Sequence, residues 1–128
     1  MIVDLENPNP GTWFDLPDEG RISLKTLSLE ELSDIRKKSV KNKVEYKQGQ
    51  RFEFNDIDED KIFNLSAQSF IVEWEGIKTK DGIEMPCTND NKVLLMRKAP
   101  SFSKFVKKCL EELNRLQEEE TEIERKNS

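Results

Sequence analysis

The chain has 128 residues, of which 37% are charged and 34% hydrophobic, and its formal net charge is -5. This length predicts one domain, since domains usually hold about 100–200 residues. The sequence contains no histidine, so the Ser-His and Cys-His nucleophile pairs and imidazole proton transfer are excluded. We therefore expect a protein that is not an enzyme. A carboxylate-dependent hydrolase is the least favoured alternative, because the spacing of the acids indicates no catalytic pair.

Membrane and secretion signals are not found in the sequence. No stretch approaches the ~18 consecutive apolar residues of a membrane helix, and residues 1–10 lack the basic and apolar regions of a signal peptide. Cys87 and Cys109 fit neither a disulfide framework nor a zinc site, so each is interpreted as a small apolar residue. We expect a soluble cytoplasmic protein without metal or cofactor.

The N-terminal part of the chain predicts an arm followed by a hairpin. Residues 1–11 are rich in Asn, Pro and Gly and are expected to form a flexible arm. Residues 12–16 and 22–26 flank the turn signal 17–20, and the second segment alternates apolar and polar residues. This pattern predicts a β-hairpin with one buried face.

A helix start follows directly. Ser28 and Glu31 have the spacing of a capping box, and Leu27 can pack on Leu32 one turn later. Apolar residues then recur at helical spacing, and lysines collect near the expected C-terminal end, where they complement the helix dipole. The helix is predicted to end near residues 38–42.

The middle of the chain predicts a second hairpin and a long helix. Residues 44–55 alternate polar with aromatic and branched side chains, and Gly49 marks a turn or a bulge. Acids at 56–60 then indicate a helix start. We expect this helix to be buried on most sides and to end at Gly76, because its apolar residues cover more than half of its circumference.

The third part of the chain begins with turn and cap signals. Residues 77–86 predict a short ribbon that turns at Asp81 and Gly82. A cap at 88–90 can start a short helix, and Pro100 forces a break before the next one.

The last predicted helix begins at about Ser101 and carries an apolar seam. This seam can serve the protein's own core, the favoured interpretation, or an intermolecular coiled coil. It weakens after Leu116, so residues 117–128 are expected to form a polar helix end or a disordered tail.

These elements together predict an α+β fold: short antiparallel hairpins followed by a mainly helical C-terminal two-thirds. The globular part is expected to be a single domain over residues 12–116. The predicted core consists of Leu24, Leu32, Ile35, Phe52, Phe54, Phe63, Phe70, Trp74, Leu94, Phe105 and Leu113.

Two charged segments are candidate binding sites. The basic segment 36–43 could bind phosphate through Arg36, Lys37, Lys38, Lys41 and Lys43. A solvated helix end is the favoured interpretation, because the chain is acidic and carries no nucleic-acid fold signature. A small nucleic-acid-binding regulator is thus the alternative function. The acids at 56–60 lack the glycine and glutamate of an EF-hand loop, so we expect no calcium site.

A set of short motifs follows one another in a particular order: Trp13-Phe14-Asp15-Leu16-Pro17, Gly20-Arg21-Ile22-Ser23-Leu24, Lys37-Lys38 with Val44-Glu45-Tyr46, Glu73-Trp74-Glu75-Gly76-Ile77, Asp81-Gly82, Pro86-Cys87-Thr88-Asn89-Asp90-Asn91-Lys92, and Phe102 to Leu113. In this order they resemble the tail assembly chaperones of long-tailed phages and prophages. The resemblance covers about residues 12–116.

The resemblance implies a non-enzymatic protein of the host-cell cytoplasm without catalytic residues. Its implied partners are the tape measure protein, which it keeps soluble, and the tail tube protein, whose assembly it assists. The sequence leaves open whether the chain also self-associates. Since the tape measure protein is largely helical, the chaperone should offer an apolar strip to amphipathic helices. The candidate contacts are Trp13, Phe102, Phe105, Val106 and Leu110, with core packing as the alternative role for all of them.

Overall fold

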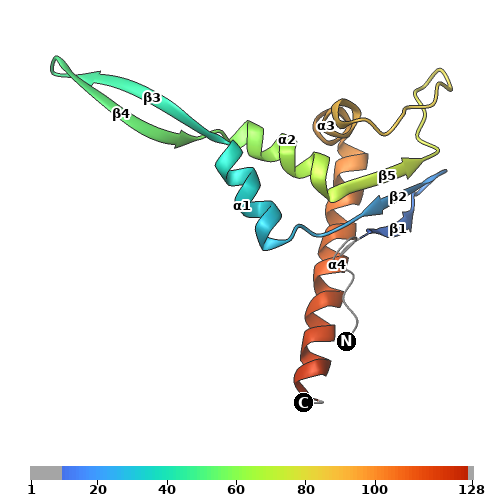
Figure 1. The fold of residues 1–128 in the computed structure, drawn as a ribbon. Coiled ribbons are helices and arrows are strands. Elements are labelled where there is room, and N and C mark those ends of the chain that lie inside the picture. The colour runs from blue at the N-terminus through green and yellow to red at the C-terminus, as the bar shows by residue number, and fades with distance from the viewer. Residues whose placement is uncertain (1–9, 127–128) are drawn as a thin grey trace. The chain divides into compact units, whose positions relative to one another are not determined.

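The computed structural model describes residues 10–126, without the side chains of 121, 122 and 124–126. The predicted α+β fold is confirmed (Figure 1). Most of the predicted N-terminal arm, residues 1–9, lies outside the described residues. The elements in chain order are β1 (Thr12–Asp15), β2 (Arg21–Leu24), α1 (Leu29–Lys38), β3 (Val40–Lys47), β4 (Gln50–Ile57), α2 (Glu59–Phe70), β5 (Ile71–Glu75), α3 (Asn89–Lys98) and α4 (Pro100–Lys126).

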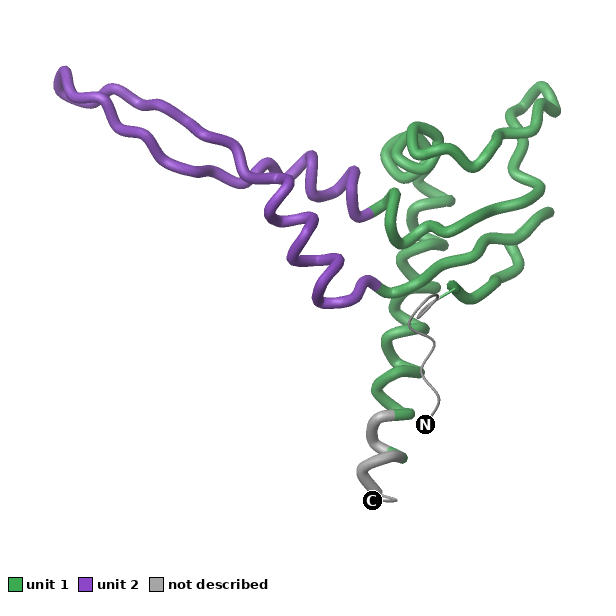
Figure 2. The backbone as a smooth tube through the Cα atoms, in the orientation of Figure 1, with its two compact units in different colours: residues 1–26, 67–128 green, residues 27–66 purple. Residues whose placement is uncertain are grey.

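Contacts divide the chain into two compact units (Figure 2). Unit 1 consists of residues 1–26 and 67–128, and unit 2 consists of residues 27–66. Unit 1 therefore holds one three-stranded sheet with α3 and α4, whereas unit 2 holds α1, the β3–β4 hairpin and most of α2.

Unit 1 is built on an antiparallel sheet with the strand order β1-β2-β5. The predicted first hairpin is confirmed, with Trp13 opposite Ser23 in the register of β1 and β2. Helix α4 packs against β2 and α3. The core of this unit contains the side chains of Ile22, Leu24, Ala67, Ile71, Trp74, Met96, Val106, Cys109 and Leu113.

The prediction of one helix from residue 56 to Gly76 is wrong in its last part. Helix α2 ends at Phe70 and the chain continues as β5, which pairs with β2 and places Trp74 opposite Ile22. The branched residues at the start of β5 suit a pleated strand, and the distant partner β2 provides the hydrogen bonds. Gly76 ends this strand at a φ of 77°, and a Cβ there would lie 2.7 Å from Cα of Gly20.

The loop and helix predicted after β5 are confirmed. The Met85 amide donates to the Ile77 carbonyl at 2.8 Å, and the ribbon turns with Gly82 at a φ of 78°. Helix α3 is capped by Thr88, whose Oγ1 accepts a hydrogen bond from the Asn91 amide at 3.1 Å. Pro100 then opens α4, which continues as a helix through Lys126.

Helix α1 of unit 2 begins as predicted. The Glu31 amide donates to Ser28 Oγ at 3.1 Å, and the Ser28 amide donates to Glu31 Oε1 at 3.2 Å, which completes the capping box. The helix ends at Lys38, and the buried Ser39 hydroxyl donates to the Ile35 carbonyl at 2.7 Å. Local side-chain chemistry therefore sets both ends of this helix.

The predicted second hairpin is confirmed and is longer than expected. Strands β3 and β4 pair over eight residues each, from Val40 opposite Ile57 to Lys47 opposite Gln50. Gln48 and Gly49 form the turn with φ values of 51° and 77°, the positive angles that two-residue hairpin loops favour. Gly49 thus marks a turn and not a bulge.

Part of the predicted core is wrong. Leu32, Phe52, Phe54 and Leu94 have 40–46% of their surface exposed. The two phenylalanines are exposed because β3 and β4 form a separate two-stranded sheet. The alternation of polar and apolar residues predicts the strands, but it does not show whether another element packs on either face. Leu32 and Leu94 lie on the outer faces of α1 and α3. Leu24, Ile35, Trp74 and Leu113 are buried as predicted, whereas Phe63, Phe70 and Phe105 are half-buried.

Candidate partner-binding surfaces

The β3–β4 hairpin presents two faces of different chemistry. Residues directly opposite each other in an antiparallel pair project to the same face, so the register assigns each side chain. We call one face the neutral face; it carries Val40, Asn42, Val44, Tyr46, Arg51, Glu53, Asn55 and Ile57. We call the other the basic face; it carries Lys41, Lys43, Glu45, Lys47, Gln50, Phe52, Phe54 and Asp56.

The neutral face combines apolar and polar side chains and has no net charge. Four of its side chains are exposed large apolar groups, and Tyr46 is the most exposed with 73% of its surface accessible. The only charges, Arg51 and Glu53, form an ion pair at 2.7 Å. Val44 and Tyr46 are neighbours on this face, whereas Asn42 and Asn55 separate them from Val40 and Ile57. Exposed large apolar side chains gathered on one face are typical of interaction sites.

The basic face combines two aromatic rings with lysines. Phe52 and Phe54 are exposed, and Lys43 Nζ lies 2.7 Å from Asp56 Oδ2 across the strands. The hydrogen bond from Lys43 lowers the pKa of Asp56, and Asp56 in turn raises the pKa of Lys43. Lys41 and Lys47 form no ion pair among the described residues, so this face can attract an acidic partner.

The five cations of the predicted phosphate-binding segment lie on two elements. Arg36, Lys37 and Lys38 occupy the last turn of α1, where they complement the helix dipole. Lys41 and Lys43 lie on β3 and belong to the basic face.

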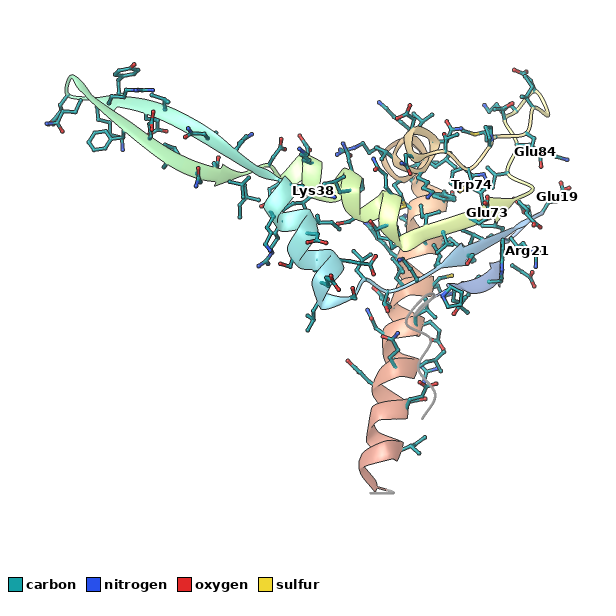
Figure 3. The ribbon with its side chains drawn as sticks, in the orientation of Figure 1. Glu19, Arg21, Lys38, Glu73, Trp74 and Glu84 are labelled. Atoms are coloured by element: carbon teal, nitrogen blue, oxygen red, sulfur yellow. The ribbon has the colours of Figure 1, made fainter. Side chains whose placement is uncertain are left out.

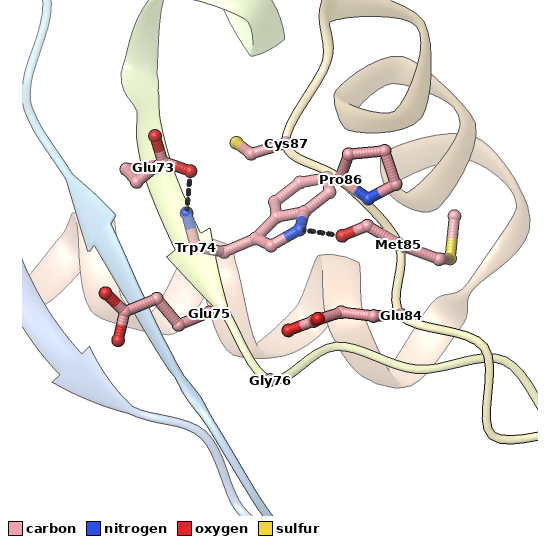
Figure 4. Close-up of a pocket in the computed structure, with 8 residues that line it drawn as sticks. All are labelled: Glu73, Trp74, Glu75, Gly76, Glu84, Met85, Pro86 and Cys87. Atoms are coloured by element: carbon pink, nitrogen blue, oxygen red, sulfur yellow. Dashed lines mark hydrogen bonds between the residues drawn. The ribbon is translucent and has the colours of Figure 1, made fainter.

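A cavity of about 360 Å³ lies beside β5 in unit 1 (Figures 3 and 4). Trp74 forms its wall: the indole is only 4% exposed, its Nε1 donates to the Met85 carbonyl at 2.8 Å, and Phe102 packs edge-on against its ring. Asn91 Nδ2 donates to the Pro86 carbonyl at 2.9 Å, which fixes the loop on the other side. The lining residues are Glu73, Trp74, Glu75, Gly76, Glu84, Met85, Pro86 and Cys87.

Carboxylates give the cavity an acidic rim. The Arg21 guanidinium donates to Glu75 at 2.9 Å and lowers the pKa of that carboxyl. Glu73 accepts a hydrogen bond from the Trp74 amide at 3.1 Å, and Glu84 forms no ion pair among the described residues. The arrangement suits a cationic side chain of a partner whose aliphatic stem contacts the apolar wall.

The lining of the cavity includes one thiol, that of Cys87, beside the three carboxylates. Burial raises the pKa of the Cys87 thiol, so at neutral pH this group is a weak nucleophile. Among the side chains that the structure describes, no group of three or more of the His, Cys, Asp and Glu types is placed to hold a metal ion. In the same range no helix is long and apolar enough to cross a membrane.

The five contact residues predicted from the sequence all lie in unit 1 but differ in accessibility. Trp13 is 41% exposed on β1 and lies under the Arg21 guanidinium, 4.1 Å from its ring centroid. Phe102, Phe105 and Leu110 of α4 are half-buried. Val106 is fully buried, so it cannot contact a partner directly and can only pack beneath the other contact residues.

The sequence interpretation missed the hairpin faces as candidate surfaces. Their signal was present as alternation in β3 and β4, but the missing third strand that leaves both faces open is a property of the fold. The motifs that line the Trp74 cavity were each identified in the sequence, but the sequence does not show that they lie together in space. That convergence depends on the hydrogen bond from Trp74 to the loop at Met85.

Comparison with known protein families adds one finding: a family model described as YdaY prophage protein matches residues 29–127. The chain belongs to the YdaY prophage protein family. The match covers all elements from α1 to α4, including the hairpin and the Trp74 cavity, so the phage or prophage origin implied by the motifs is confirmed for this YdaY-family protein. No curated protein and no solved structure matches the chain.

Proposed function

We propose that this prophage protein is a non-enzymatic tail assembly chaperone that binds the tape measure protein and assists tail tube assembly. The observation that carries the proposal is the neutral face of the β3–β4 hairpin, which exposes four large apolar side chains: Val40, Val44, Tyr46 and Ile57. A small chain that leaves so much apolar surface uncovered is suited to bind another chain.

The neutral face fits an amphipathic helix. Eight residues per strand give the hairpin a length of roughly 27 Å, which corresponds to about five turns of helix. The face has no net charge, so burying it against an apolar stripe leaves no unpaired ion, since Arg51 and Glu53 neutralise each other. The tape measure protein implied by the motif order is largely helical and offers such stripes.

Unit 1 provides a second, smaller contact in this proposal. The Trp74 cavity accepts a cationic side chain of the same partner at its acidic rim. Exposed Trp13 and half-buried Phe102, Phe105 and Leu110 remain the proposed apolar contacts of this unit.

The test is co-expression with the tape measure protein of the same prophage. We expect the wild-type chain to raise the soluble fraction of the tape measure protein several-fold. The double variant Val44→Asp/Tyr46→Asp places charges on the neutral face and should lose this effect. The matched control is Leu29→Asp/Ile83→Asp, which changes two exposed apolar residues outside the hairpin and should keep it.

Circular dichroism of each purified variant checks that it is folded. An unchanged solubility with the wild-type chain would overturn the proposal. Full activity of the Val44→Asp/Tyr46→Asp variant would show that the neutral face is not the binding surface.

A further inference from the structure

The charges of the chain are distributed very unevenly. Residues 36–54 contain seven Lys and Arg but only two Glu, although the whole chain has a formal net charge of -5. Residues 117–124 contain five Glu and no Lys or Arg. The first segment runs from the last turn of α1 through most of the hairpin, and the second lies at the end of α4. The hairpin itself, residues 40–57, has four Lys and Arg and three Asp and Glu, so its net charge is positive whereas that of the helix end is negative.

The end of α4 has uncovered apolar surface. Leu116 is 42% exposed and Ile123 is 58% exposed, and their spacing of seven residues places them on one side of the helix. Glu119 and Glu120 follow Leu116 by three and four residues, so they flank this stripe. Arg115 pairs with Glu119, whereas Glu120 forms no ion pair among the described residues.

The basic face of the hairpin is the chemical complement of this helix end. It carries two exposed aromatic rings, Phe52 and Phe54, and three lysines against the carboxylates Glu45 and Asp56, whereas the helix end carries two aliphatic residues and several carboxylates. A two-stranded hairpin alone is at best marginally stable in water, so a helix packed on one face would stabilise it.

We propose that the basic face of the hairpin in one copy of the chain binds the acidic end of α4 in a second copy. The chain thereby self-associates through a heterologous contact between β3–β4 and the helix after Leu113. A second copy is favoured over nucleic acid because the helix end supplies apolar side chains as well as negative charge. In addition, an acidic chain repels phosphate.

The lengths of the helix end and the hairpin indicate how strong the association can be. Residues 114–126 of α4 span roughly 20 Å, which is shorter than the ~27 Å hairpin, and a helix of ~10 Å diameter covers the width of two strands. One such contact is smaller than the ~800 Å² per partner of a standard interface. The association is therefore weak, depends on protein concentration and weakens with salt.

The experiment exchanges the charges of the two elements. The hairpin variant is Lys41→Glu/Lys47→Glu and the helix variant is Glu119→Lys/Glu120→Lys. The control variant, Lys80→Glu/Lys98→Glu, changes the net charge as the hairpin variant does but at exposed sites of unit 1. Mass is measured by light scattering after gel filtration and by sedimentation at low and high salt.

We expect the wild-type and control chains to self-associate at low salt, with at least a tenfold weaker association for either charge variant alone. An equimolar mixture of the two variants should associate again, because each then meets an oppositely charged partner. Circular dichroism confirms that both variants are folded.

Three results would overturn the inference: a wild-type chain that is monomeric at every concentration, variants that associate like the wild type, or a mixture that stays monomeric. A gel shift of duplex DNA by a monomeric wild-type chain, lost in the hairpin variant, would assign the basic face to nucleic acid instead. None of these results would affect the proposed chaperone role, because that role uses the neutral face.

Discussion

The two units of the molecule differ in how far the apolar side chains of their strands are buried. In unit 1, β2 has a neighbour on each edge, and its Ile22 and Leu24 are fully buried. In unit 2, β3 and β4 have only each other, and their branched and aromatic side chains are exposed. The same residue types therefore stabilise the fold in one unit and are available for binding in the other.

This contrast predicts that aromatic truncations will have very different costs. Trp74→Ala should lower the free energy of unfolding by about 3–5 kcal/mol, because it removes a buried ring, its contact with Phe102 and its hydrogen bond to Met85. Phe52→Ala in the hairpin should cost about 1 kcal/mol or less, the usual contribution of a cross-strand pair. Urea unfolding followed by circular dichroism measures both.

The milder variant Trp74→Phe keeps an aromatic ring and loses the indole donor, so it covers the case in which the alanine variant does not fold. An equal cost for the hairpin and core truncations would contradict the distinction between the units.

Two glycines with similar backbone angles provide a second comparison. Gly20 has a φ of 91° in unit 1, and a Cβ there would collide with the carbonyl of Glu75. Gly49 has a φ of 77° at the hairpin turn, and nothing lies within 4 Å of its added Cβ. Gly49→Ala should cost about 1–2 kcal/mol from backbone strain alone, and Gly20→Ala should cost more. Thermal unfolding of the two variants ranks them, and the reverse order would show that Gly20 has room to move.

The smallest expected effect is the response to acid. Hydrogen bonds from Arg21 and Lys43 lower the pKa values of Glu75 and Asp56, so each carboxylate adds stability above its ordinary pKa of about 4 and loses it as the pH falls through the lowered value. Both side chains are exposed, so each contribution is small.

Glu75→Gln and Asp56→Asn should therefore destabilise the chain slightly at neutral pH, and this effect should shrink as the pH falls through the lowered pKa values. Chemical denaturation at neutral pH and over a series of acidic pH values measures this difference. A variant that remains destabilised in acid would mean that the carboxylate acts through packing and not through its charge.

Local signals allowed much of the fold to be predicted from the sequence. The capping box of Ser28 and Glu31, the turn at Gly49 and the break at Pro100 each depend on residues close in sequence. Strand β5 was missed because Ile71 and Trp74 extend an apolar run that fits a buried helix equally well. Only pairing with β2, about fifty residues earlier, decides between the two.

The candidate surfaces were predicted less completely than the fold. Alternation at Phe52 and Phe54 indicated strands, but it cannot show whether another layer covers them. In the same way, the motifs around Trp74 and Pro86 were identified from the sequence as two separate motifs. Their convergence on one cavity requires the loop from residue 77 to 86 to fold back on β5.

The aromatic residues that absorb in the near ultraviolet are divided between the units. Both tryptophans, Trp13 and Trp74, belong to unit 1, whereas the single tyrosine, Tyr46, lies on the neutral face of the hairpin. Indole emission therefore reports on one unit and phenol emission on the other. The native chain can show by intrinsic fluorescence, without any attached dye, which of its halves responds when a ligand is added.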